Sequence, residues 1–96
     1  NVYVNMGIAF QNLRGYSIAQ RCFTIALTKN PSDPIPYFKL ACIKAGGRDH
    51  AGALNYLEKS FALGFKDFDK IDSDPRFAKL KKNPRFTSLI EKYKSK

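Results

Sequence analysis

Residue types that build disulfide frameworks and metal sites are scarce in this sequence. Its 96 residues include two cysteines, one histidine and no tryptophan. Two cysteines do not make a disulfide framework, and no stretch approaches the roughly 18 apolar residues that a membrane span needs. Because 44% of the residues are hydrophobic and 26% are charged, disorder is excluded as well. We therefore expect one soluble, folded domain with a core of medium-sized apolar side chains.

Acidic residues are also few. The sequence has 8 Asp and Glu residues and 17 Lys and Arg residues, which gives a formal net charge of +9. The imbalance is concentrated near the C-terminus, where residues 76–96 contain eight basic residues and only Glu91 is acidic. Such a surplus favours attraction to anionic partners but does not bear on the fold. The sequence does not begin with Met, and we expect it to be a fragment of a longer protein.

Catalytic candidates are almost absent. His50 stands beside Asp49 at the start of an expected helix, without a nucleophile or a second carboxylate at a spacing that indicates acid-base chemistry. Cys22 and Cys42 lie on expected helices without partner ligands, so buried free thiols are the expectation. We therefore predict no enzyme activity, no metal and no cofactor. Free cysteines favour a reducing compartment, which indicates the cytoplasm.

Apolar residues recur every three or four positions and predict four long helices. These helices cover approximately the segments 2–13, 18–27, 34–45 and 49–63. Pro31 and Pro34 separate the second helix from the third, because proline cannot continue a helix and restricts the residue before it. Asp33 can cap the third helix, with Pro34 in its first turn. Gly46-Gly47 ends the third helix, and Gly64 is placed to cap the fourth.

The chain matches itself best at an offset of 34 residues. The pairs that keep the size class of the side chain are Tyr3 with Tyr37, Met6 with Leu40, Gly7 with Ala41, Ala19 with Ala53, Phe23 with Leu57, Ala26 with Ser60 and Leu27 with Phe61. Small residues allow two antiparallel helices to approach closely while larger neighbours fill the groove between them. The repeat therefore predicts stacked helical hairpins.

Residues 1–34 carry a spaced signature of an aromatic, a Leu-Gly pair, an aromatic, then Ala, an aromatic, Ala and Pro. The matching residues are Tyr3, Met6, Gly7, Phe10, Ala19, Phe23, Ala26 and Pro31, with Met standing for Leu. This segment resembles the tetratricopeptide repeat family. Residues 35–65 resemble a degenerate second repeat, with Lys44 at an aromatic position and Phe65 in place of the closing proline. The resemblance implies an all-α fold of tetratricopeptide-like hairpins, an α-solenoid that winds into a right-handed superhelix.

Residues 66–96 do not repeat this pattern and form a third unit. The phrases at residues 74–77 and 83–86 each combine a cap, a first-turn proline and an aromatic anchor. We expect two short capping helices whose apolar stripes seal the end of the stack, as solenoids require to remain soluble. The segment resembles the tail that commonly follows the last repeat in tetratricopeptide proteins.

In this family the concave surface is lined by the first helix of each hairpin, and its ligand is usually an extended peptide or a helix of a partner protein. The expected concave-face residues are Val4, Asn5, Ile8, Gln11, Asn12, Phe38, Lys39 and Cys42. The four apolar members of this set would form a strip edged by amides and Lys39, which suits a peptide with hydrophobic anchors. The resemblance thus implies a protein-interaction module or scaffold.

Two alternatives concern this strip. A preceding repeat or the C-terminal tail could cover it, which would make the chain the structural C-terminal end of a longer array without a ligand of its own. The strip could also hold an acidic chaperone C-terminus in a carboxylate clamp, for which Asn5 and Lys39 match two places. Ile35 occupies a place where a clamp would carry a basic residue, so the clamp is incomplete.

The basic tail offers a third alternative, in which the chain binds phosphates on a membrane surface or on nucleic acid. Its basic residues are Arg76, Lys79, Lys81, Lys82, Arg85, Lys92, Lys94 and Lys96. The aromatics Phe77, Phe86 and Tyr93 fall on the apolar stripes of the expected helices, which assigns them to the core rather than to base stacking. This placement disfavours nucleic-acid binding.

Overall fold

The computed structural model describes residues 2–95, and residues 1 and 96, at the ends of the first and third expected units, lie outside the described range. The described residues form six α-helices and two 3₁₀ turns, with no strand among them. The elements are α1 (Val2–Asn12), α2 (Tyr16–Lys29), α3 (Pro34–Gly46), α4 (His50–Ala62), α5 (Phe68–Ser73), η1 (Pro75–Phe77), η2 (Leu80–Lys82) and α6 (Pro84–Lys94). The expected all-α class is confirmed.

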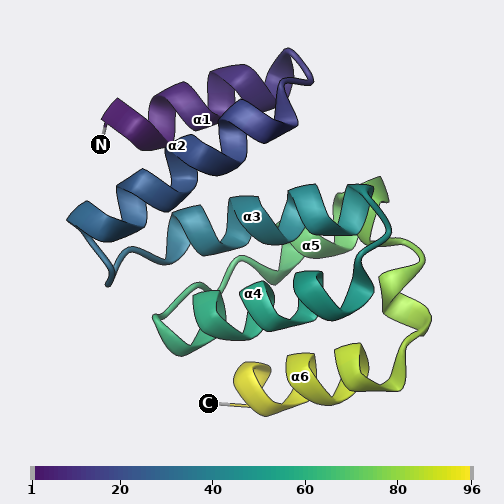
Figure 1. Ribbon diagram of the computed structural model, residues 1–96. Coiled ribbons are helices and arrows are strands. Elements are labelled where there is room, and N and C mark those ends of the chain that lie inside the picture. The colour runs from purple at the N-terminus through teal and green to yellow at the C-terminus, as the bar shows by residue number, and fades with distance from the viewer. Residues whose placement is uncertain (1, 96) are drawn as a thin grey trace.

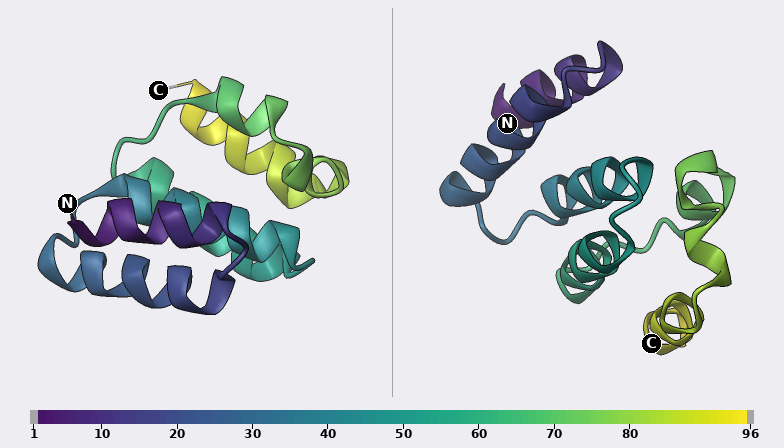
Figure 2. Two further views of the ribbon diagram at one scale, coloured as in Figure 1. Left: turned by 90° about the horizontal axis from the view of Figure 1, so that it is seen from above. Right: turned by 45° about the vertical axis from the view of Figure 1, so that its right-hand side comes forward.

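The helices follow one another as two hairpins and a C-terminal segment (Figure 1). Helix α1 packs along α2, α3 packs along α4, and α2 also lies against α3. The C-terminal segment, residues 65–95, packs on the side of α3 and α4 away from the first hairpin (Figure 2, right). The molecule measures 33 × 25 × 20 Å. Within residues 2–95 no helix has the length and apolar character needed to cross a bilayer.

Side-chain caps start α3 and α6 where the sequence predicts them. The Asp33 carboxylate accepts a hydrogen bond from the Ile35 amide at 3.0 Å, in front of Pro34 at the first turn of α3. The Asn83 side chain accepts from the Arg85 amide at 2.9 Å in the same way at α6. These bonds satisfy amides that have no partner inside the helix.

Part of the C-terminal segment differs from the expectation. The phrase that begins at Asp74 starts only the 3₁₀ turn η1, because η2 and then Pro84 follow within a few residues and leave no room for an α-helix. Helix α5, which was not predicted, precedes this turn. It begins after Asp67, whose carboxylate accepts a hydrogen bond from the Lys70 amide at 3.2 Å.

The turns inside the two hairpins have the same backbone geometry at the same 34-residue spacing. Arg14 and Arg48 both adopt a left-handed conformation, with φ of 64° and 65°. In both turns the following residue donates its amide to the carbonyl oxygen five residues earlier, at 2.7 Å and 2.8 Å. The repeat seen in the sequence is therefore also a repeat of local structure.

Helix α3 belongs to both parts of the core. On one face, Leu40 and Ile43 pack with Ala19 and Phe23 of α2. Another face joins the larger cluster that α4 and the C-terminal segment complete. The residues of α3 in that larger cluster are Phe38, Ala41, Cys42 and Ala45. Burial on both sides makes α3 the central element of the molecule.

Gly7 of α1 allows the close approach of α2. A Cβ atom at this position would lie 2.5 Å from Cε1 of Phe23, whose ring is fully buried. We predict that Gly7→Ala destabilises the protein, because overpacking costs about 1–3 kcal/mol and outweighs the helix-propensity gain of about 1 kcal/mol. Urea denaturation followed by circular dichroism measures the change.

The matched control for this substitution is Gly46→Ala at the end of α3. A Cβ atom there would make an ordinary contact, at 3.6 Å from Cδ of Arg76. The control is expected to be neutral or stabilising. Equal effects of the two substitutions would contradict a close approach at Gly7.

Candidate functional site

The residues expected on the concave face do not line one open surface. The structure exposes Asn5 and Asn12, leaves Ile8 and Lys39 half-buried, and buries Val4, Gln11, Phe38 and Cys42. Phe38 is only 4% exposed and Cys42 is 0% exposed. The expectation that these two side chains, and those of Val4 and Gln11 at 8% exposure each, are open to a partner is thereby corrected. A binding role for the exposed members stays a prediction.

The C-terminal segment covers this face of α3. The Phe65 ring stacks on Phe38 with the ring centroids 4.4 Å apart, and the Phe77 ring lies 6.2 Å from Phe38. Phe77 is fully buried. Aromatic side chains bury large apolar areas and gain from offset stacking. Through these contacts the C-terminal segment covers Phe38, which is part of the expected apolar strip on α3.

Asp74 and Arg76 pair with each other within the C-terminal segment, beside this contact. The guanidinium of Arg76 donates from Nε to Oδ1 of Asp74 at 3.0 Å and from a terminal nitrogen to Oδ2 at 2.6 Å. Oδ1 also accepts from the Arg76 backbone amide at 2.9 Å. Burial opposes ionisation of the Asp74 carboxyl, but the hydrogen bonds and charge of Arg76 outweigh it and lower its pKa below the ordinary value.

The depressed pKa of Asp74 predicts a loss of stability in acid. The contribution of its charge is fully present above the ordinary carboxyl pKa of 3.8 and is lost as the pH falls through the lower pKa of the folded state. Asp74→Asn keeps the cap acceptor but removes the charge, at a cost of about 1.5 kcal/mol near neutral pH. The wild-type advantage should therefore shrink below about pH 4.

Urea midpoints measured from pH 2 to 7 for both proteins check this prediction. Glu91→Gln removes an exposed carboxyl on α6 and serves as the control. If the difference in stability between the wild type and Asp74→Asn stays constant down to pH 2, the charge of Asp74 does not stabilise the fold.

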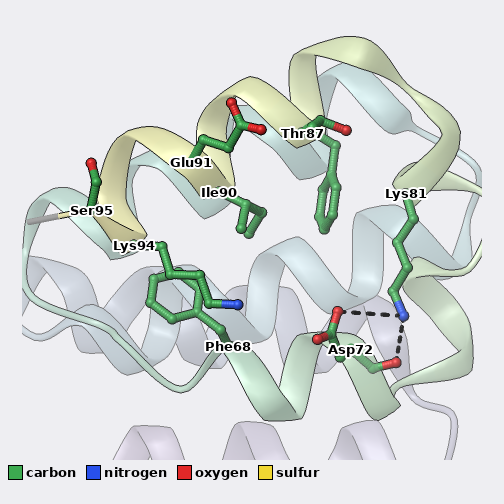
Figure 3. A pocket seen from close by; sticks show the side chains of 9 residues that line it. Phe68, Asp72, Lys81, Thr87, Ile90, Glu91, Lys94 and Ser95 are labelled. Atoms are coloured by element: carbon green, nitrogen blue, oxygen red, sulfur yellow. Dashed lines mark hydrogen bonds and ion pairs between the residues drawn. The ribbon is translucent and has the colours of Figure 1, made fainter.

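An open groove lies between α5 and α6 (Figure 3). It encloses about 660 Å³, which is within the range of common ligand sites. The lining residues are Phe68, Asp72, Lys81, Phe86, Thr87, Ile90, Glu91, Lys94 and Ser95. The sequence does not predict this groove, because one of its walls is α5, a helix that was not expected from the sequence. The carboxylate of Asp67 followed by an apolar Phe68 and Ile71 is the signal that could have indicated that helix.

The floor of the groove is apolar. Phe86 is buried in the main core cluster, while Phe68 and Ile90 are half-buried and pack against that cluster. Figure 3 shows Ile90 pointing from α6 toward the space above α5. Phe68 and Ile90 are therefore the apolar side chains that the groove exposes to solvent, while Phe86, 6% exposed, lies beneath them in the core.

The rim of the groove carries charges of both signs. Nζ of Lys81 donates a hydrogen bond to the carbonyl oxygen of Asp72 and lies 3.7 Å from its carboxylate. On the other side Nζ of Lys94 lies 5.7 Å from the centroid of the Phe68 ring, and Glu91 is exposed. The two basic and two acidic residues balance, so the rim favours neither an anionic nor a cationic ligand.

Five basic residues of the tail make contacts with other residues of the chain at its surface. Its observed contacts are Arg76 with Asp74, Lys81 with Asp72, Lys92 with Glu58, Arg85 with Asn55, and Lys94 with the Phe68 ring. Lys96 lies outside the described residues. These contacts lie at the surface, where ion pairs contribute little, and Lys79 and Lys82 are exposed as well.

The two cysteines are buried and the histidine is half-buried. Burial raises the pKa of the Cys42 thiol to about 11, so it stays protonated near neutral pH and is not an activated nucleophile. His50 is half-buried at the first position of α4. Across residues 2–95 no three His, Cys, Asp or Glu side chains gather closely enough to hold a metal ion.

Models of known protein families, curated proteins and solved structures were compared with this chain, and none of them matched.

Proposed function

We propose that this chain is a protein-interaction module that binds a short segment of a partner protein in the groove between α5 and α6. The observation that carries the proposal is the partly exposed apolar pair Phe68 and Ile90, backed by the buried Phe86, inside a charged rim. An apolar surface with a polar rim is the usual composition of a protein interface.

We also propose that residues 1–34 and 35–65 are hairpins of the tetratricopeptide type, stacked in a right-handed sense and followed by a cap. The paired helices and the repeated turns at Arg14 and Arg48 support this assignment. Tetratricopeptide proteins are interaction modules, so the assignment agrees with the proposed binding function. It is independent of which surface does the binding.

The groove replaces the concave strip as the proposed site, because a peptide with hydrophobic anchors needs open apolar surface. Phe38 and Cys42, which were to supply that surface, are buried. The remainder, exposed Asn5 and Asn12 with half-buried Ile8 and Lys39, can hold a peptide backbone but offers one partly open apolar side chain. It forms at most a polar extension of a site elsewhere.

The groove defines the chemistry of its occupant. The floor suits a segment with one or two aliphatic or aromatic anchors, in an extended or a helical conformation. Since the rim charges balance, little of the affinity is expected to come from net electrostatic attraction. Binding should therefore change little with salt, whereas binding through the basic tail would weaken steeply.

Selection from a random peptide library displayed on phage tests the proposal. We expect enriched peptides with two spaced hydrophobic residues, whose dissociation constants are then measured for purified variants. Thr87→Arg places a long side chain over the groove from an exposed position on α6. It should weaken the selected peptides by about tenfold or more, while helix propensity keeps the fold intact.

Ser88→Arg is the matched control, because Ser88 is the exposed neighbour that does not line the groove. It adds the same charge to the same helix and should leave affinity within about twofold. Peptides that bind Thr87→Arg and wild type equally would place the site elsewhere. A library without enriched peptides would contradict the interaction function, and loss of binding at high salt would favour the basic tail.

A further inference from the structure

A smaller hollow lies at one end of the second hairpin, where the turn between α3 and α4 meets the C-terminal segment. It encloses about 340 Å³, which is at the small end of the range for ligand sites. Its walls come from the end of α3, the α3–α4 turn, the start of α4, η1 and the two residues after η1. We call this hollow the turn pocket. The lining residues are Ala45, Gly46, Arg48, His50, Pro75, Arg76, Ala78 and Lys79.

Cationic side chains line the turn pocket, and its described lining residues include no Asp or Glu. Arg48 and Lys79 are exposed, and neither forms an ion pair within residues 2–95. His50 adds a ring nitrogen that can donate a hydrogen bond. Two unpaired charges of the same sign therefore border one small hollow, and an anion between them would offset their repulsion.

The acidic residues nearest to this lining along the chain are bound elsewhere. The carboxylate of Asp49 accepts a hydrogen bond from the Gly52 amide at 3.0 Å and caps α4. The carboxylate of Asp74 accepts hydrogen bonds from Nε and Nη2 of Arg76. The other terminal nitrogen of Arg76, Nη1, has no hydrogen bond to any residue between 2 and 95. Arg76 can thus supply a further donor while it keeps its ion pair.

We propose that the turn pocket binds the phosphate group of a small, soluble phosphate monoester. Such a group carries a charge of about −1.5 to −2 at pH 7, which matches the two unpaired cations. Its oxygens accept hydrogen bonds from several directions, and the donors here come from the turn, from α4 and from the residues around η1. Arg and Lys are the side chains that phosphate sites commonly use.

The size of the pocket limits the ligand. Ala45, Gly46 and Ala78 contribute little side-chain volume, which leaves room for a phosphate group and a small carrier. The site lies apart from the α5–α6 groove and does not depend on peptide binding there. It also differs from anion binding by the basic tail as a whole, because Arg48 and His50 belong to the second hairpin.

The signal of His50 provides a local probe of binding. It is the only histidine in the sequence, so its imidazole protons are identified directly in a proton NMR spectrum. Inorganic phosphate, glycerol 3-phosphate and acetate are titrated separately into the 96-residue chain at constant pH and constant ionic strength. We expect a saturable shift of the imidazole signal with both phosphate probes and little change with acetate, which carries only one charge.

Arg48→Gln removes one cation from the pocket and should weaken the binding of both phosphate probes by about tenfold or more. Arg14→Gln is the matched control. Arg14 is exposed and has the same left-handed turn geometry at the 34-residue offset, but it does not line the pocket. This substitution should leave the affinity within about twofold, and circular dichroism checks that both variants keep the fold.

Three results would overturn the proposal. The first is the absence of a saturable shift with either phosphate probe. The second is an equal shift with acetate, or equal weakening by Arg48→Gln and Arg14→Gln, because the net charge of the chain would then explain the binding. The third is binding to vesicles that contain phosphatidic acid when neither soluble probe binds, because a lipid headgroup would then be the source of the phosphate.

Discussion

The stacking of Phe65 and Phe77 on Phe38 is the contact on which the rest of the structure depends. It joins the C-terminal segment to α3, whose opposite face already packs on α2. A helix buried on two sides cannot shift without disturbing both neighbours, since protein interiors are densely packed and transmit strain. Helix α3 thus links the N-terminal hairpin, the second hairpin and the C-terminal segment, with one cluster on each of two faces.

This contact also decides which surfaces remain open. By covering Phe38 and Cys42, the C-terminal segment removes the apolar centre of the face that the family resemblance assigns to ligands. The same segment creates the groove, because η1 packs on α3 and α6 packs on α4 while a space stays open between α5 and α6. The binding surface proposed for this chain is therefore a consequence of how its cap is built.

The features that could be predicted from the sequence depend on local chemistry. Asp33-Pro34 and Asn83-Pro84 start helices because their side chains cap the next turn wherever the segment lies. The burial of Phe38 could not be predicted in this way. It depends on Phe65 and Phe77, which are distant in sequence and reach α3 only through the path of the tail. Helix α5 was missed for a related reason, since six residues show too little periodicity to be recognised.

Native-state hydrogen exchange tests most directly whether the C-terminal segment is an integral part of the core. Local opening would release the amides of a loosely attached segment long before those of the core, whereas global unfolding releases both together. The account predicts that interior amides of α3 and α6 share one free energy of opening and the same dependence on denaturant. Exchange of α6 amides by a separate opening, at much lower free energy than α3, would contradict it.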